Sequence, residues 1–209
     1  MADLAALTAA IEAGNRVAAA ELTQAAVDAG TDPRDALGAM TVAMDVIGRK
    51  FQDGDIFVPE MLIAARAMKA GTAILEPLLA AAGVVPEFRA VVGTVEGDLH
   101  DIGKNLVAML LQGAGFTVVN LGAGVTSAQF VSAVKEHSPA ILGMSALLTT
   151  TLPHMGETIQ ALKDEGLREQ VKVMVGGAPV TQAWADEVGA DGYGANAGMA
   201  VERAKALMG

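Results

Sequence analysis

Asp98 and His100 are the two residues of this chain whose types and spacing best fit a chemical role. They lie in the segment GDLHDIG, residues 97–103. A carboxylate that accepts the proton of one imidazole nitrogen leaves the other nitrogen free to bind a metal. The pair therefore predicts a histidine metal ligand that is oriented by an aspartate.

The elements on either side of this segment place it at the edge of a sheet. Residues 89–95, RAVVGTV, are apolar and β-branched enough to predict a buried parallel strand, and residues 103–111 have the spacing of an amphipathic helix. His100 then lies at the carboxyl end of a strand, which is where open α/β sheets bind their ligands.

The rest of the second half alternates strand and helix patterns. Strands are predicted at 117–121, 140–144 and 171–175, with a fifth before 192–195, and helices at 127–137, 154–165, 181–188 and 197–208. This alternation predicts βαβ units and a parallel sheet. We expect a five-stranded, flavodoxin-like (Rossmann-type) α/β domain over residues 89–209, with strand order 2-1-3-4-5.

The first 83 residues have a purely helical pattern. Leu4, Leu7 and Ile11 share one face, and Asp32 before Pro33 has the form of a helix start. Pro77 is expected to kink or end the fourth helix. Residues 1–83 therefore predict a four-helix bundle, with residues 84–88 as the linker.

Composition narrows the choice of partners and compartment. The net charge is −10, which argues against nucleic acid or an anionic membrane as a partner, and no apolar run is long enough to span a bilayer. The absence of cysteine excludes disulfides and thiolate chemistry and is compatible with a reducing compartment. The first residues show no signal peptide, so we expect a cytoplasmic protein.

Small and hydroxyl residues follow the other predicted strands. Ser145 and Leu147 come after the third strand, Gly176 and Gly177 after the fourth, and the segment 192–195 after the fifth. Each has an ordinary explanation, because small residues let loops turn. Together they predict a slot lined by backbone and hydroxyl groups, suited to a long ligand.

Two other uses of this topology fit less well. A dinucleotide site needs the pattern G-x-G-x-x-G and an acidic residue after the second strand, but Gly93, Gly97 and Gly103 are differently spaced and the second strand is followed by GAG. A phospho-receiver domain needs an aspartate after its third strand, where this chain has Ser145.

The order D-x-H-x-x-G, S-x-L and G-G resembles the cobalamin-binding domain of corrinoid-dependent methyltransferases, methionine synthase among them. The helical half also looks like the cap of that family, so the resemblance covers nearly the whole chain. It is strongest to the separate corrinoid proteins of methylamine, methanol and aryl-ether demethylation. The residues that carry it are Asp98, His100, Gly103, Ser145, Leu147, Gly176 and Gly177, with Phe51, Gly54, Phe57, Pro59, Met61 and Ala65 in the helical half.

The resemblance implies a role for each matching residue. His100 would bind cobalt as the lower axial ligand in place of the cofactor's own base, Asp98 would hydrogen-bond its ring, and Thr151 would extend that relay. Ser145 and the glycine pair would hold the displaced nucleotide tail. Further cofactor contacts are expected from Leu99, Asp101, Ile102, Gly103, Leu147, Thr149, Tyr193, Gly194 and Ala195. Candidates to cover the upper face are Val58, Met61, Leu62 and Ala65, with bundle packing as the alternative.

The resemblance also implies a function. Cobalamin, as methylcobalamin or another corrinoid, would carry a methyl group as its cobalt cycles between Co(I) and methyl-Co(III). The partners would be a substrate:corrinoid methyltransferase, a corrinoid:tetrahydrofolate or coenzyme M methyltransferase, and a reductive activator. Two alternatives share the cofactor: a cobalamin-dependent sensor and an adenosylcobalamin-binding mutase subunit.

Overall fold

The computed structural model describes residues 3–82 and 88–209 and divides the chain into two compact units. The first comprises residues 1–86 with 112–115, and the second comprises 87–111 with 116–209. Of the predicted linker, 84–88, all but Phe88 lies outside the described residues. Because the positions of the two units relative to one another are not determined, each is described by itself.

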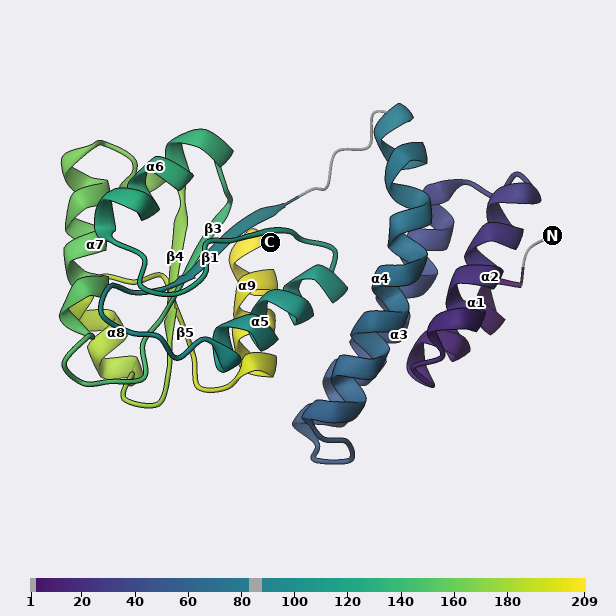
Figure 1. Ribbon diagram of the computed structural model, residues 1–209, viewed down its shortest axis with the longest axis horizontal. Helices are drawn as coiled ribbons and strands as arrows, with labels where there is room; N and C mark the ends of the chain where they lie inside the picture. Colours follow the sequence, from purple (N-terminus) through teal and green to yellow (C-terminus); the bar gives the residue numbers. More distant parts are fainter. Residues whose placement is uncertain (1–2, 83–87) are drawn as a thin grey trace. The chain divides into compact units, whose positions relative to one another are not determined.

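The described residues 3–82 of the first unit form a set of packed helices (Figure 1). They are α1 Leu4–Glu12, α2 Arg16–Asp28, α3 Pro33–Gln52 and α4 Val58–Ala81. The side chains of Asp3, Asn15 and Asp32 each accept a hydrogen bond from an amide in the first turn of α1, α2 and α3, which explains where these helices begin. The predicted helical bundle is confirmed.

The core of this helical unit consists of aliphatic and methionine side chains. The largest of those that are fully buried are Leu7, Ile11, Met40, Met61, Met68 and Leu75. Gly71 allows α4 to approach its neighbours, because a Cβ there would lie 2.6 Å from Met40 and 2.8 Å from the Thr23 hydroxyl. Helix α4 continues through Pro77 to Ala81 rather than ending there. Pro77 lies near the carboxyl end of α4, where the loss of a single amide donor interrupts little further helix.

The second unit is a five-stranded parallel sheet in the order β2-β1-β3-β4-β5, as predicted. The strands are β1 Arg89–Thr94, β2 Thr117–Asn120, β3 Ile141–Ser145, β4 Lys172–Gly176 and β5 Gly192–Gly194. The helices are α5 Ile102–Gly113, α6 Ser127–His137, α7 Pro153–Asp164, α8 Gln182–Val188 and α9 Ala197–Met208, with a short 3-10 turn η1 Arg168–Gln170.

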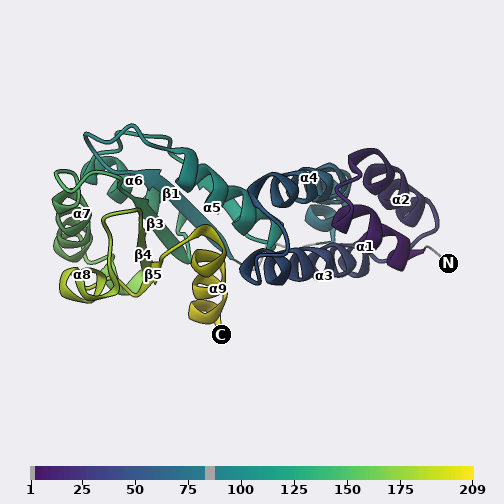
Figure 2. The same cartoon turned by 90° about the horizontal axis from the view of Figure 1, so that it is seen from below.

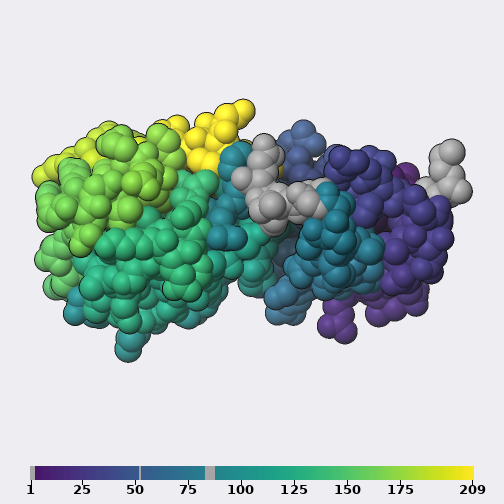
Figure 3. All heavy atoms as spheres, turned by 90° about the horizontal axis from the view of Figure 1, so that it is seen from above, coloured from purple at the N-terminus to yellow at the C-terminus, as the bar shows by residue number. Residues whose placement is uncertain are grey.

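Helices cover both faces of the sheet (Figures 1 and 2). Helices α6, α7 and α8 lie on one face, where Phe130, Met155 and Ile159 belong to the main hydrophobic core with the buried strand residues. Helices α5 and α9 lie on the other face, and α9 is at the surface of the unit (yellow in Figure 3). Gly194 lets α9 pack closely, because a Cβ there would be 2.6 Å from that of Ala200.

The register of the sheet aligns the carboxyl ends of four strands. Thr94 pairs with Ser145, Ser145 pairs with Gly176, and Gly176 pairs with Gly194. The loops that leave these positions therefore start side by side along one edge. No helix in the described ranges 3–82 and 88–209 is long and apolar enough to cross a membrane.

Candidate functional site

The loop between β1 and α5 turns sharply so that Asp98 points inward. Gly97 makes the turn with φ +76°, a conformation that residues with a Cβ rarely adopt, and the Asp98 amide donates to the Val95 carbonyl at 3.1 Å. Gly124, in the loop after β2, donates its amide to the Asp98 carbonyl at 3.0 Å. The Asp98 side chain is fully buried as a result.

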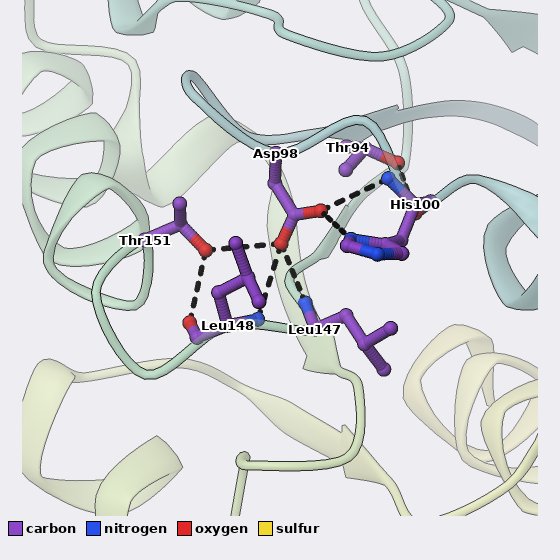
Figure 4. A network of polar contacts seen from close by, with 6 residues as sticks. All are labelled: Thr94, Asp98, His100, Leu147, Leu148 and Thr151. Atoms are coloured by element: carbon purple, nitrogen blue, oxygen red, sulfur yellow. Dashed lines mark hydrogen bonds and ion pairs between the residues drawn. The ribbon is translucent and has the colours of Figure 1, made fainter.

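One carboxylate oxygen of Asp98 is occupied by His100. Asp98 Oδ1 accepts the His100 amide at 3.0 Å and lies 2.8 Å from ring atom Nδ1 (Figure 4). An ionised carboxylate at this distance is matched by a proton on Nδ1, and in the neutral imidazole with that proton the lone pair lies on Nε2. The His100 side chain is 53% exposed, which leaves Nε2 accessible as a ligand.

The other carboxylate oxygen binds the loop between β3 and α7. Asp98 Oδ2 accepts the amides of Leu147 at 2.7 Å and Leu148 at 3.2 Å, and the hydroxyl of Thr151 at 3.0 Å. Burial by itself would raise the pKa of the Asp98 carboxyl, but the hydrogen bonds from His100, Leu147 and Thr151 outweigh it and hold the pKa well below its usual value. Asp98 is thus an anion that joins two loops.

Thr151 lies where the sequence predicts a third member of the relay. Its side chain is buried, and its Oγ1 lies 3.0 Å from Asp98 Oδ2 and 2.9 Å from the Leu148 carbonyl. A hydroxyl has one proton, so these two acceptors compete for it or share it. The contact of Thr151 with Asp98 is therefore present.

The glycine-rich strand ends pack against one another through backbone. Gly177 has φ +128°, and a Cβ there would lie 1.8 Å from the Ala146 carbonyl oxygen. A Cβ at Gly176 would lie 3.1 Å from the Gly194 carbonyl oxygen. Any side chain at 177 would therefore displace the chain just before Leu147, whose amide binds Asp98.

The fifth strand begins later than the sequence predicts. Tyr193 and Gly194 lie within β5 rather than after it, and Ala195 follows the strand with an exposed side chain. The segment GYG lacks the β-branched residues that mark the other strands, so it resembles a loop in sequence. Ser145 and Gly176 are likewise the last residues of β3 and β4, and Thr149 is exposed in the loop before α7.

Several apolar side chains on the two loops that meet at Asp98 face solvent. Leu99 is 79% exposed and Ile102 is 86% exposed, and Leu147 and Leu148 are also exposed. Large apolar side chains grouped at an exposed edge are typical of a surface that a ligand covers. Leu148 was not expected from the sequence, because nothing in its local pattern separates an exposed leucine from a buried one.

The cap candidates in the helical unit differ in exposure. Met61 and Ala65 are buried among the helices, Leu62 is partly buried, and Val58 is exposed. Bundle packing therefore accounts for Met61 and Ala65. Phe57, just before α4, is the exposed aromatic residue at this end of the helix.

A polar cluster at the start of α5 was not expected from the sequence, although one member, Asp101, was expected as a cofactor contact. It consists of Asp101, Lys104, Asn105 and Asn120. Burial lowers the pKa of the Lys104 ammonium, and the charge of Asp101 partly opposes that change. From the sequence, Lys104 is one polar position of an amphipathic helix, and Asn120 is in a different element.

Comparison with known protein families shows which family this chain belongs to. Residues 88–202 match a family described as a B12 binding domain, and residues 4–76 match a second family of that description. The chain belongs to the B12 binding domain family. This B12-binding protein is 48% identical to dimethylamine corrinoid protein 1 of Methanosarcina acetivorans over 81% of its length and 80% of the relative's.

Two further matches cover almost all of this B12-binding protein. A corrinoid protein of Desulfitobacterium hafniense is 42% identical over 94% of this chain and 93% of its own. The crystal structure of the methanol:cobalamin methyltransferase complex from Methanosarcina barkeri contains a chain that matches with TM-score 0.88 and 33% identity, over 98% of this chain and 79% of that one. The sequence-based family assignment and its cofactor class, a corrinoid, are confirmed.

Proposed function

We propose that this protein carries a methyl group on the cobalt of a bound corrinoid, taking it from one methyltransferase and giving it to another. The observation that carries the proposal is the buried Asp98 carboxylate holding the exposed ring of His100, in a chain of the B12 binding domain family. When bound, the corrinoid supplies a cobalt centre that can accept and release a methyl group.

The donor set at the site fits such a cofactor. In the described part of the chain, no three side chains of histidine, cysteine, aspartate or glutamate converge as a metal site. A single imidazole would be sufficient as the protein ligand of a metal that a macrocycle already holds, since imidazole nitrogen is a suitable donor for such metals. Asp98 fixes which ring nitrogen faces outward and makes it a better donor.

The neighbouring residues provide an apolar seat around His100. Leu99 and Ile102 are exposed on the segment that carries His100, and Leu147 is exposed on the loop that binds Asp98, so a flat macrocycle bound at His100 would cover apolar side chains. Covering them would remove apolar area from water and would exclude water from the side of the macrocycle that faces the His100 ring. Leu148 adds to the same surface.

The aligned strand ends are where the nucleotide tail would enter. Ser145, at the end of β3, offers a hydroxyl, and Gly176 and Gly194 on the paired strands present no side chains there. Backbone groups can therefore approach a ligand closely along this part of the edge. Thr149, Tyr193 and Ala195 belong to the same strand ends and loops.

The relatives support a choice of partners. The Methanosarcina acetivorans relative is named for dimethylamine, which supports a methylated amine as the methyl donor and a substrate:corrinoid methyltransferase as the first partner. The second partner would be a methyltransferase that uses tetrahydrofolate or coenzyme M, and a reductive activator would restore cobalt that has been oxidised.

The test is to load the purified protein with methylcobalamin, remove free cofactor, and follow loss of the methyl group by the change in the visible absorption spectrum of the bound corrinoid. We expect one corrinoid retained per chain, and loss of its methyl group when an acceptor methyltransferase and its acceptor are added. His100→Ala should retain less corrinoid. A wild-type protein that retains no corrinoid after desalting would contradict the proposal.

A further inference from the structure

Lys104 is a buried cation whose position has no role in the site described above. It lies in the first turn of α5, and only 4% of it is exposed. Its ammonium donates to Asn105 Oδ1 and to Asn120 Oδ1, each at 2.6 Å. Burying an ammonium group is unfavourable unless other groups replace its lost hydration, and these two hydrogen bonds offset part of that cost.

Asn105 connects this cation to the residue after His100. Its Oδ1 accepts from Lys104, and its Nδ2 donates to Asp101 Oδ2 at 2.9 Å. The amide therefore lies between a positive and a negative group, with its oxygen toward the first and its NH₂ toward the second. Hydrogen bonds with an ionised partner are shorter and stronger than neutral ones, so both contacts benefit from this orientation.

Asn120 links the hydrogen-bond relay formed by Lys104, Asn105 and Asp101 to the sheet. It is the last residue of β2, its Nδ2 donates to Asn105 Oδ1 at 2.9 Å, and its Oδ1 accepts the Gly122 amide at 3.0 Å. The carboxyl end of β2 and the first turn of α5 are thus held together by side chains from both elements. This cluster is separate from the contacts that Asp98 makes on the β3 side.

His100 lies between the two networks. Its amide and ring bind Asp98, its carbonyl accepts the Thr94 hydroxyl at 3.3 Å, and the next residue, Asp101, enters the relay. Asp98 sets the direction of the ring, and the relay fixes the backbone on the carboxyl side of His100. A small displacement of that backbone would move Nε2 away from the position where it meets a ligand.

We propose that Lys104 is a positioning residue for His100, acting through Asn105 and Asp101 to hold the lower ligand in place. The inference rests on the proposed function, since it assigns Lys104 a part in cobalt ligation. Its effect is expected on the bond between His100 and cobalt, rather than on recognition of the nucleotide tail at the other strand ends.

Cobinamide, a corrinoid without the nucleotide tail, is the probe for this inference. Affinity is measured for wild type and for Lys104→Met, which keeps an apolar stem but removes the charge. Lys135→Met is the matched control, because Lys135 is a half-exposed lysine of the same unit that pairs with Glu165. The electron paramagnetic resonance spectrum of bound Co(II) cobinamide reports nitrogen ligation directly, since the probe has no base of its own.

We expect Lys104→Met to bind cobinamide about tenfold more weakly, the size of effect usual for a residue that orients a metal ligand. The fraction of cobalt showing nitrogen splitting should fall as well, while Lys135→Met should match wild type. Asn105→Ala breaks the relay but leaves the Lys104 side chain in its buried site, and it should weaken binding to a similar degree. This second variant keeps the inference testable if Lys104→Met does not fold.

The outcomes separate this inference from the proposed function. Suppose that the wild type shows nitrogen splitting and that both relay variants match it in cobinamide affinity and in splitting. That result would overturn the positioning role and leave the methyl carrier intact. Absence of nitrogen splitting from wild type itself would overturn the inference, whereas the methyl carrier is contradicted only if the wild type retains no corrinoid. If Lys104→Met unfolds at a lower temperature but keeps the nitrogen splitting of the wild type, Lys104 contributes to stability alone and the inference is rejected.

Discussion

The buried carboxylate of Asp98 is the residue on which the site is organised. One oxygen accepts hydrogen bonds from two amides and one hydroxyl of the loop after β3, and the other accepts from the amide and the ring of His100. The same group that orients the ring therefore also sets the loop carrying Leu147. A change at Asp98 should affect fold stability and ligand geometry together, and a change at Thr151 should affect them less.

Asp98→Asn tests this dual role. An asparagine keeps one acceptor oxygen and presents an NH₂ group to donors on the other side, so at least one group of contacts is lost. We expect the cofactor-free protein to lose about 2 kcal/mol or more in urea unfolding, given that hydrogen bonds to a charged group contribute about 1.5–3 kcal/mol. A variant as stable as wild type would contradict this description of Asp98.

Thr151→Val is the milder comparison at the same carboxylate. It removes one hydroxyl and leaves Asp98 Oδ2 with the Leu147 and Leu148 amides. The expected loss is about 1 kcal/mol by urea unfolding, with corrinoid still bound. A loss equal to that of Asp98→Asn would mean that Thr151 supports more of the loop than one hydrogen bond.

The elements bring the site together through the sheet register. Strand ends at Thr94, Ser145, Gly176 and Gly194 are neighbours on the ladder, and Gly177 allows the loops after β3 and β4 to touch through backbone. The loop that holds Leu147 is thus supported by Asp98 on one side and by Gly177 on the other.

Gly177→Ala should disturb this support. The new Cβ would meet the Ala146 carbonyl oxygen at 1.8 Å, so the β3 loop must shift. Gly166→Ala is the matched control, because Gly166 also has positive φ, +69°, but has nothing within 4 Å of its added Cβ. We expect cobalamin affinity, measured by titration, to fall in the first variant only. Equal affinities would show that the close approach is not needed.

Ser138→Gly should stabilise the α/β unit. Ser138 ends α6 in the left-handed region, with φ 43°, where a side chain is unfavourable and glycine is preferred. The gain expected in urea unfolding is up to about 1 kcal/mol, since the strain relieved is partly offset by the extra freedom of glycine in the unfolded chain. A destabilised variant would reveal a favourable contact of the serine side chain.

Sequence patterns located most elements because capping residues and apolar periods are local. The bounds of α6 and α9 coincide with prediction, and Thr126 and Asn196 cap them. Asp98, His100 and Gly177 could be singled out by motif. The Lys104 cluster could not, because Asn120 and Lys104 meet only after β2 and α5 pack together. The exposure of Ile102 and Leu148 is likewise a tertiary property.

At the scale of the whole molecule, two units with separate cores share one chain, and the described site lies in the α/β unit. A ligand that binds only the folded state stabilises it in proportion to the logarithm of its concentration over Kd. The cofactor should therefore act as a structural support of the α/β unit as well as a carrier.

Cobalamin should accordingly raise the unfolding temperature. At a concentration about 100 times its Kd, the added free energy of unfolding is about 2.7 kcal/mol. The shift is measured by thermal unfolding followed by circular dichroism, with His100→Ala at the same cobalamin concentration for comparison. A wild-type shift no larger than that of His100→Ala would mean that the histidine contributes nothing to retention.

The most direct test of the central claim identifies the atom bound to cobalt. Protein labelled with ¹⁵N only in histidine is loaded with Co(II) cobalamin, and its electron paramagnetic resonance spectrum is compared with that of unlabelled protein. If His100 is the lower ligand, the nitrogen splitting changes from a triplet to a doublet on labelling, and His100→Ala abolishes the doublet. A triplet that persists in the labelled protein would mean that the cofactor's own base remains on cobalt, and it would contradict the account.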